Sequence, residues 1–189
     1  GLSRLPWVSI IDVGPSSSGL ITLLKENLPD DKKHLAAYHR LRMTKEHSIN
    51  PFDTPLGCRY PLPAHMDFLK NLMSLLATPV KEKAPPDKVP DIMMRAIDCA
   101  YEELAPGNKA KPYRANILPE LHQLLLQENI PIDHLTTWWE VVDALFERGH
   151  IHGAIQAQRY AVPVLADIAT QIALNQGIIY GYDQNIREK

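Results

Sequence analysis

The chain has 189 residues and 45% of them are apolar, so it can bury a core and is not globally disordered. Its 20 basic and 22 acidic residues give a net charge of −2, which argues against a general binder of nucleic acid or membrane surfaces. No apolar run approaches the roughly 20 residues that cross a bilayer, and Cys58 and Cys99 form neither a zinc-ribbon nor a disulfide pattern. We therefore expect a soluble, cytoplasmic chain without direct membrane insertion.

The N-terminal part is predicted to begin with a strand and a helix. Residues 7–13 (WVSIIDV) are rich in β-branched side chains and end at a Gly-Pro-Ser stop, which is typical of a buried strand. Residues 20–28 follow as a helix with leucines on one face and Ser18 as its N-cap. Residues 37–44 alternate with a period of two, which favours a second strand and leaves a helix open.

The chain from residue 64 onward carries the apolar spacing of helices. A charged, proline-rich connector is expected at residues 79–90, and Pro163 is expected to kink the last helix. Thr136 or Thr137 is the expected N-cap of one helix, and Glu140 three residues after Thr137 would complete a capping box. The predicted helices are 64–78, 91–105, 118–129, 135–148 and 152–175.

These elements predict a mostly helical fold made of two parts. An α/β segment with short strands occupies residues 1–60, and a mainly α-helical bundle occupies residues 61–189. The 16 prolines lie mostly between apolar runs, where they start or stop elements, and no internal repeat is present.

A glycine-flanked loop, GPSSSG at residues 14–19, follows the first predicted strand and opens the first predicted helix. That is the setting of a phosphate-binding loop, which needs a lysine and a hydroxyl directly after its second glycine. Leu20 and Ile21 occupy those two positions and supply neither charge nor metal coordination. Taken alone, the loop is better interpreted as a polar turn with a helix cap than as a nucleotide site.

Two histidines, His150 and His152, would share a face of an extended segment and could then ligate a metal. On a helix they diverge, and no third ligand of obvious spacing lies nearby. Polar loop histidines are therefore the preferred interpretation, and we predict no metal site. A small metal-dependent enzyme built around this pair remains the weakest of the alternatives.

The adjacent tryptophans Trp138 and Trp139 begin an amphipathic predicted helix. Neighbouring residues on a helix point about 100° apart, so one ring can lie in the core while the other faces a neighbour. Core packing is the preferred interpretation. The second is a contact surface for another chain or domain, because tryptophan is enriched at binding hot spots.

No complete active site is visible from these residue types. Asp12 ends the first predicted strand, where ligands gather in parallel α/β sheets, but it is a lone carboxylate. Neither cysteine has an activating neighbour, and no nucleophile motif is present. Arg40 and Arg42 form a small basic patch that is better interpreted as solvated, so a nucleic-acid partner is not expected.

Longer strings of sequence resemble one known family. Residues 7–52, a strand ending in Asp12, a helix and a strand running into Asn50-Pro51, resemble the second and third strands of the RecA-like motors of conjugation and type IV secretion. The string INPFDTPLGCRYP at 49–61 looks like the type IV secretion ATPases of the IcmB (DotO) type, from Dot/Icm systems and conjugative elements. Residues 137–146 (TWWEVVDALF) and 157–163 (AQRYAVP) look like later stretches of the same proteins.

This resemblance implies an internal fragment of a motor domain. The family's Walker A loop would precede residue 1 and its Walker B carboxylates would follow residue 189, so the fragment alone is expected to hold no catalytic residue and no cofactor. ATP and Mg²⁺ are implied for the parent protein only. Asp12 is the residue that the resemblance carries over as near the nucleotide, whereas Asn50 and Pro51 are expected to be structural. Residues 1–60 would be a partial RecA-like segment, and the helical part would be an insertion.

The same resemblance implies partners and a location. The parent would form a homo-oligomer, contact other secretion-system components, and lie at the inner face of the bacterial inner membrane through that complex. Trp138 and Trp139 are the expected partner-binding residues. The alternative hypothesis is a non-enzymatic helical interaction module, an adaptor or scaffold, in which the family-like strings are accidental.

Overall fold

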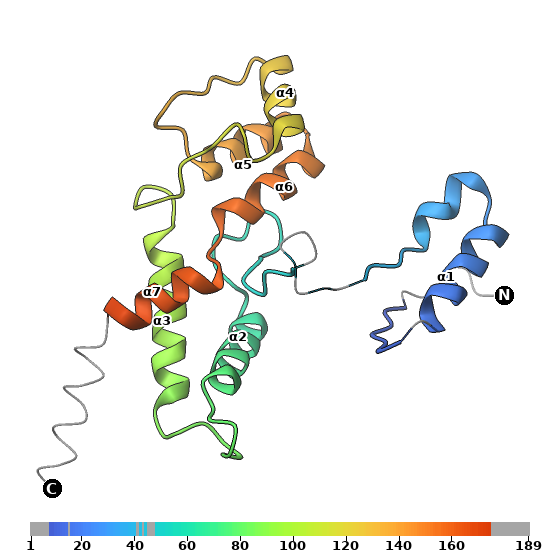
Figure 1. Ribbon diagram of the computed structural model, residues 1–189. Coiled ribbons are helices and arrows are strands. Elements are labelled where there is room, and N and C mark those ends of the chain that lie inside the picture. The colour runs from blue at the N-terminus through green and yellow to red at the C-terminus, as the bar shows by residue number, and fades with distance from the viewer. Residues whose placement is uncertain (1–7, 15, 41, 43, 45–47, 175–189) are drawn as a thin grey trace, which may run out of the picture. The chain divides into compact units, whose positions relative to one another are not determined.

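The computed structural model describes residues 8–14, 16–40, 42, 44 and 48–174, and these residues are mainly helical (Figure 1). The chain divides into two compact units, residues 1–49 and residues 50–189. The first unit contains α1 (Ser16–Asn27) and the 3₁₀ helix η1 (Asp30–Leu35), and the second contains the helices from residue 63 onward. Among the described residues, no helix has the length and apolar character that crossing a membrane requires.

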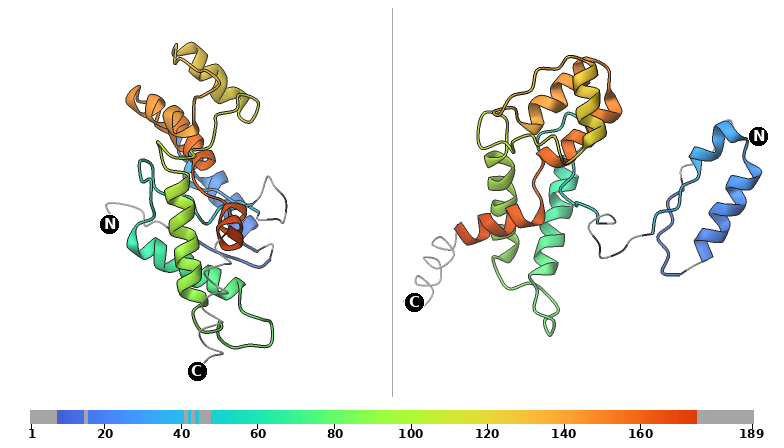
Figure 2. Two further views of the ribbon diagram at one scale, coloured as in Figure 1. Left: turned by 90° about the vertical axis from the view of Figure 1, so that its left-hand side faces the viewer. Right: turned by 45° about the horizontal axis from the view of Figure 1, so that its top comes forward.

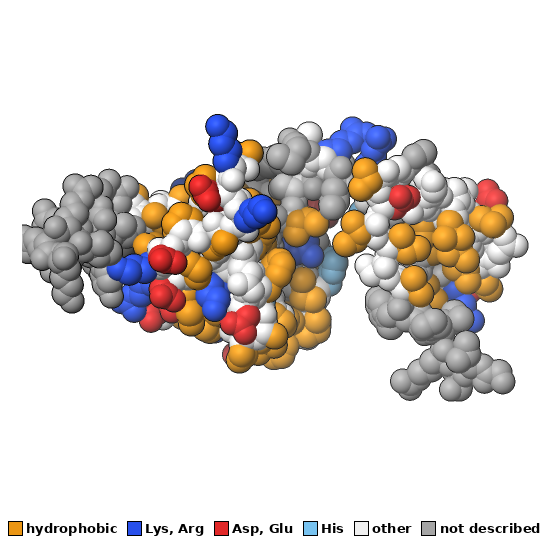
Figure 3. Space-filling model, turned by 90° about the horizontal axis from the view of Figure 1, so that it is seen from below, with side chains coloured by type: hydrophobic (Ala, Val, Ile, Leu, Met, Phe, Trp, Pro, Cys, Tyr) orange, Lys and Arg blue, Asp and Glu red, His pale blue; other side chains and the backbone are white. Residues whose placement is uncertain are grey.

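The first unit is built around α1, which begins at three consecutive serines. The predicted helix at 20–28 is confirmed, but it starts four residues earlier because Asp12 caps its first turn: the Oδ2 atom of Asp12 accepts hydrogen bonds from the amide and hydroxyl of Ser17. No residue of α1 is buried. Apolar side chains therefore gather on the surface of this unit (Figure 3), and those more than 40% exposed are Val8, Ile10, Ile11, Val13, Leu20, Leu23, Leu24, Leu35 and Tyr38.

The two strands expected in the first unit do not form among its described residues. Residues 8–13 and the described residues of 37–44 have no strand assignment, while Trp7, Leu41 and Met43 lie outside the described residues. A strand needs a neighbouring strand for its backbone hydrogen bonds, and two short strands without a wider sheet are marginal in water. The mostly helical character is thus found, and a RecA-like sheet remnant is not.

In the second unit, three helices share one core. They are α2 (Pro63–Leu76), α3 (Val89–Glu103) and α7 (Leu165–Leu174), and α7 crosses α3 (Figure 2). This α2–α3–α7 core consists of Phe52, Met66, Leu69, Met73, Met93, Ala96, Ile97, Ala100, Tyr101 and Ile168. The helical spacing of these residues within α2 and α3 is the pattern from which both helices were predicted, and both are confirmed.

The other three helices of this unit form a separate core. They are α4 (Pro119–Gln127), α5 (Trp138–Glu147) and α6 (Ile151–Ala161). Small residues on α6 let α5 approach closely, and every buried aliphatic residue of α5 faces this group. The α4–α5–α6 core consists of Leu121, Leu125, Ile130, Trp138, Trp139, Val141, Val142, Leu145, Ala154, Ala157, Ala161 and Val162.

The helix ends follow local chemistry. Thr137 is the N-cap of α5 and forms the predicted capping box with Glu140, whose amide donates to the Thr137 hydroxyl at 3.3 Å. The helix expected at 152–175 is two helices in the described residues, because the chain leaves helical geometry at Val162 and Pro163 offers no amide for a continuing hydrogen bond. The four other predicted helices from residue 64 onward are confirmed.

Candidate functional site

The densest polar network in the described residues surrounds residues 50–60, which we call the strap. The strap precedes α2 and contacts both cores of the second unit. Phe52 is fully buried in the α2–α3–α7 core, and Leu56 packs against the α4–α5–α6 core. Its first residue, Asn50, donates from Nδ2 to the carbonyl oxygen of Pro163 at 2.8 Å, at the break between α6 and α7. The strap thus fastens the point where one helical group passes into the other.

Gln158 of α6 holds the middle of the strap. Its side chain is 1% exposed, and its amide nitrogen lies 2.8 Å from the carbonyl oxygen of Thr54, 3.0 Å from the Thr54 hydroxyl and 3.0 Å from the carbonyl oxygen of Pro55. Its amide oxygen accepts from the backbone amide of Gly57 at 3.0 Å. Thr54 in turn donates from its hydroxyl to the carbonyl oxygen of Cys58 at 2.7 Å. Every polar atom of this buried side chain is therefore satisfied by the strap.

Arg59 and Tyr60 end the strap and reach opposite cores. The Nη2 atom of Arg59 lies 2.5 and 2.7 Å from the two carboxylate oxygens of Asp143 on α5, and the guanidinium sits 4.2 Å from the ring centre of Trp139. The other terminal nitrogen, Nη1, is buried and has no hydrogen-bond partner among the described residues. The Tyr60 hydroxyl donates to Asp98 on α3. Adjacent residues thus tie α5 and α3 to one loop.

Burial shifts the pKa of titratable groups in the strap and beside it. Burial raises the pKa of the Asp53 carboxyl, and the Arg159 guanidinium, with its Nε 3.6 Å from Oδ2, opposes that rise. Burial also raises the pKa of the Tyr60 and Tyr101 hydroxyls, so both stay neutral over the physiological range. Tyr101 uses its proton to donate to the carbonyl oxygen of Phe52. The hydrogen bonds of Tyr60 and Tyr101 fix the position of the strap against α3.

Asp12 lies in the first unit as the cap of α1. The hydrogen bond from the Ser17 hydroxyl lowers the pKa of Asp12, and the Ser17 amide, 3.1 Å from the same oxygen, acts in the same direction. The carboxylate is exposed. Its contacts are those of a helix cap, and its expected place near a nucleotide stays a prediction. Pro15, in the glycine-flanked loop, lies outside the described residues.

Trp138 and Trp139 are both 2% exposed and lie in the α4–α5–α6 core. Trp138 stacks on Tyr160 with ring centres 4.9 Å apart and meets Tyr113 edge-on at 4.7 Å. Trp139 donates from its indole nitrogen to the carbonyl oxygen of Leu104 at 3.0 Å. Both rings lie in the core, which is the preferred interpretation of the pair from the sequence. Direct contact of these rings with a partner stays a prediction that requires their covering residues to move.

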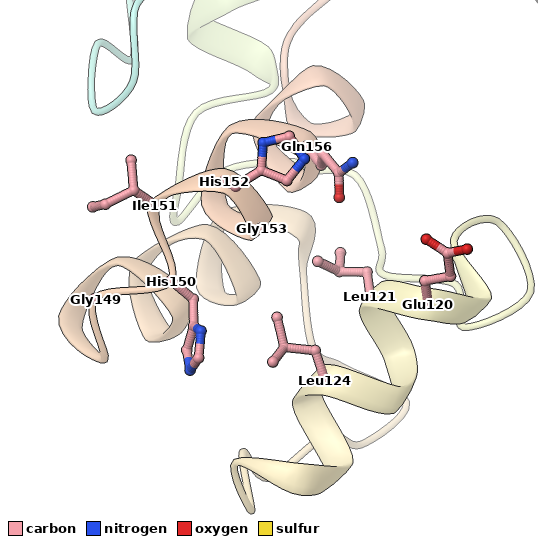
Figure 4. Close-up of a pocket in the computed structure, with 9 residues that line it drawn as sticks. All are labelled: Glu120, Leu121, Leu124, Gly149, His150, Ile151, His152, Gly153 and Gln156. Carbon is pink, nitrogen blue, oxygen red and sulfur yellow. The ribbon is translucent and has the colours of Figure 1, made fainter. Parts of the chain in front are cut away.

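His150 and His152 stand at the start of α6, beside a hollow of about 470 Å³ between α4 and α6 (Figure 4). His150 points to Glu128, with 3.0 Å between its Nε2 and the carboxylate Oε1. Gly153 lets the two helices approach, because a Cβ atom there would lie 3.3 Å from side-chain carbons of both Leu121 and Leu124. Among the described residues, no three potential metal ligands come together, at this hollow or elsewhere.

Comparison with known proteins gives no relative: no family model, no curated protein and no solved structure matches this chain. The site is therefore defined by its own geometry.

The strap is not apparent as a unit from the sequence. Residues 49–61 stand out there only as a family-like string, and nothing near them indicates that Gln158 buries its amide among them. A signal existed, because Gln158 lies at helical spacing between Ala154 and Ala161, on the apolar face of α6. A polar side chain on such a face needs partners from another segment, and Thr54 and Gly57 supply them.

Proposed function

We propose that this chain is an internal segment of a type IV secretion motor ATPase of the IcmB (DotO) type. In this proposal the helical unit supports assembly and energised substrate translocation, and the segment alone hydrolyses no ATP. One observation supports the proposal most: the three strings that resemble the family, at 49–61, 137–146 and 157–163, contact one another around the strap.

These contacts argue against a chance resemblance to the family. The first string supplies Thr54 and Arg59, the second supplies Asp143, and the third supplies Gln158. Segments separated by about a hundred positions meet through specific side-chain hydrogen bonds. Strings that maintain one shared framework are expected to occur together in proteins that share that framework.

The proposed chemistry belongs to the parent protein. Phosphoryl transfer needs amides and a lysine around the phosphates and carboxylates that hold Mg²⁺, and the proposal assigns those groups to sequence outside this segment. In the parent protein, Asp12 of the partial RecA-like segment at residues 1–60 would lie near the nucleotide. The partners would be other subunits of a homo-oligomer and components of the secretion complex at the inner face of the inner membrane.

The test begins with the coding sequence on both sides of this segment. The proposal expects a GxxxxGK[ST] loop upstream and an apolar strand ending in paired acids downstream. A start codon directly before residue 1 and a stop codon directly after residue 189 would overturn it. The second step replaces Phe68 and Leu75, two exposed apolar residues of α2 in the helical unit, by Gln in the parent and measures its oligomeric state, with Asn71→Gln on the same helix as the control. Assembly that survives the double substitution would contradict the assembly role.

A free-standing helical interaction module is the second candidate function. The observation that favours it is the exposed apolar side chains of both units: α1 buries no residue, and Phe68, Leu75 and Leu76 of α2 are more than half exposed. Contiguous apolar surface of this kind marks interaction sites in soluble proteins. The start and stop codons described above, together with a defined binding partner, would establish this candidate instead.

A further inference from the structure

The two cores of the second unit have little helix-to-helix packing in common. The most extensive packing joins α5 with α6, α2 with α3, and α3 with α7, so each of these pairs lies within one group. The core residues of the two groups form separate clusters. In Figure 1 the two groups follow one another along the unit and are joined by the break between α6 and α7. Their relative orientation is therefore set by the segments that connect them.

The connecting contacts are mainly polar: several lie at that break, and others join α5 to the end of α3, through Trp139 and Leu104, and to the strap, through Arg59. Asn50 of the strap binds the carbonyl oxygen of Pro163, and Gln158, one helical turn earlier, binds the rest of the strap. Lys111 approaches from the connection between α3 and α4, with its Nζ 2.9 Å from the carbonyl oxygen of Val162 and 2.7 Å from Asp167. Residues 162–164 are thus bracketed by hydrogen bonds, and Val162 and Pro163 are also fully buried.

This difference sets the order in which parts of the unit open. Opening the strap uncovers Phe52 and Leu56 and breaks a set of hydrogen bonds, while unfolding either core uncovers ten or more apolar side chains. Local openings of native proteins have lower free energies where fewer apolar contacts are lost. The helical hydrogen bonds are interrupted at Pro163, and Val164 after it is exposed, so a turn of one group against the other needs no helix to unwind there.

We infer that the strap is a conformational lock: with Gln158 bound to residues 54–57 the two helical groups keep one orientation, and without it they turn about residues 162–164 while each stays folded. This inference is independent of the proposed function. The buried Gln158 side chain and the break at Pro163 act together in it, and both lie in the second unit.

The experiment compares the full chain with Gln158→Leu, which keeps the volume and removes the hydrogen bonds. Gln156→Leu is the matched control, since Gln156 lies on the same helix and faces the hollow of Figure 4. Backbone amide residual dipolar couplings of α3 and α5 report their relative orientation. We expect one alignment tensor to fit both helices in the wild type and the control, and two different tensors in Gln158→Leu.

Amide hydrogen exchange on the same proteins distinguishes opening from unfolding. In Gln158→Leu, exchange at residues 50–60 should accelerate at least tenfold, while the core amides of α3 and α5 keep their wild-type rates. Equal acceleration everywhere would overturn the inference, because the unit would then open only as a whole. A single tensor in the variant, or two tensors in the wild type, would overturn it as well. If Gln158→Leu does not fold, Asn50→Ala, at the half-buried end of the strap, takes its place with the same criteria.

Discussion

Arg59 and Asp143 are separated by 84 positions in sequence, and their side chains meet at 2.5 Å across the face of Trp139. The pair joins the end of the strap to the middle of α5. The Asp143 side chain is half-exposed, so solvent weakens the ion pair, whereas the Trp139 ring is buried and its contact with the guanidinium is sheltered.

Replacing Arg59 by Ala should therefore destabilise the chain modestly. We expect a loss of about 1–2 kcal/mol in the free energy of unfolding, most of it from the indole contact and the packing of the arginine stem. Urea denaturation followed by tryptophan fluorescence measures it. Arg95→Ala on the exposed side of α3 is the control and should change stability by less than about 0.5 kcal/mol. Equal effects of the two substitutions would contradict a specific role for Arg59.

The capping box of α5 gives a second prediction. Thr137→Ala removes the oxygen that accepts from the Glu140 amide, and it should cost about 1 kcal/mol. Thr170→Ala on α7 provides the control, because among the described residues its hydroxyl bonds to the carbonyl oxygen of Ala166 within the same helix. Thermal unfolding of the two variants should separate them by several degrees. A larger loss in Thr170→Ala would show that the cap is unimportant.

The close approach of α4 and α6 gives a third prediction. Gly153→Val places a branched side chain where even a single Cβ lies 3.3 Å from Leu121 and Leu124, so it should destabilise the chain by about 1–3 kcal/mol. Gly19→Val on α1, where an added Cβ has no atom within 4 Å, should be neutral or slightly stabilising through helix propensity. Circular dichroism during denaturation measures both. A neutral Gly153→Val would mean that the two helices separate freely.

Alkaline pH gives a fourth prediction, from the tyrosines beside the strap. Burial raises the pKa of Tyr60 and Tyr101 in the folded state, whereas the unfolded chain ionises them near the ordinary value of 10.0. Their contribution to stability is therefore complete below about pH 10 and is lost as the pH rises through the folded-state pKa values. Stability measured between pH 8 and pH 11 should fall, and the fall should be smaller in Tyr101→Phe. An unchanged slope in that variant would contradict the assignment.

Local chemistry explains what could be predicted from the sequence. Helices from residue 63 onward follow from apolar spacing, and the start of α5 and the break at Pro163 follow from residues adjacent in the chain. Residue spacing alone could not establish the two strands expected in the first unit, because a strand forms only beside a partner strand. The described part of that unit contains no partner strand.

The strap shows why the candidate site was harder to predict. Gln158 and Thr54 are 104 positions apart, and nothing near either residue specifies the other. The burial of both Trp138 and Trp139 likewise depends on distant residues, since Tyr160 and Arg59 cover the two rings. Asp12 was expected to end a strand, but residues 8–13 form none, and its contacts with Ser17 are those of a helix cap. A carboxylate that caps a helix and one that binds a ligand have the same sequence signature.

The order of the segments has a consequence for synthesis on the ribosome. Phe52 and the residues of α2 emerge first, yet the core that buries them includes Ile168, and the amide that binds Thr54 belongs to Gln158. The bonds of Gln158 to the strap and the closure of this core by Ile168 therefore wait until more than a hundred further residues have been translated, whereas α2 and α3 can pack together earlier. During that interval Phe52 lacks part of its final cover, and exposed apolar side chains of this kind are what chaperones bind on emerging polypeptides.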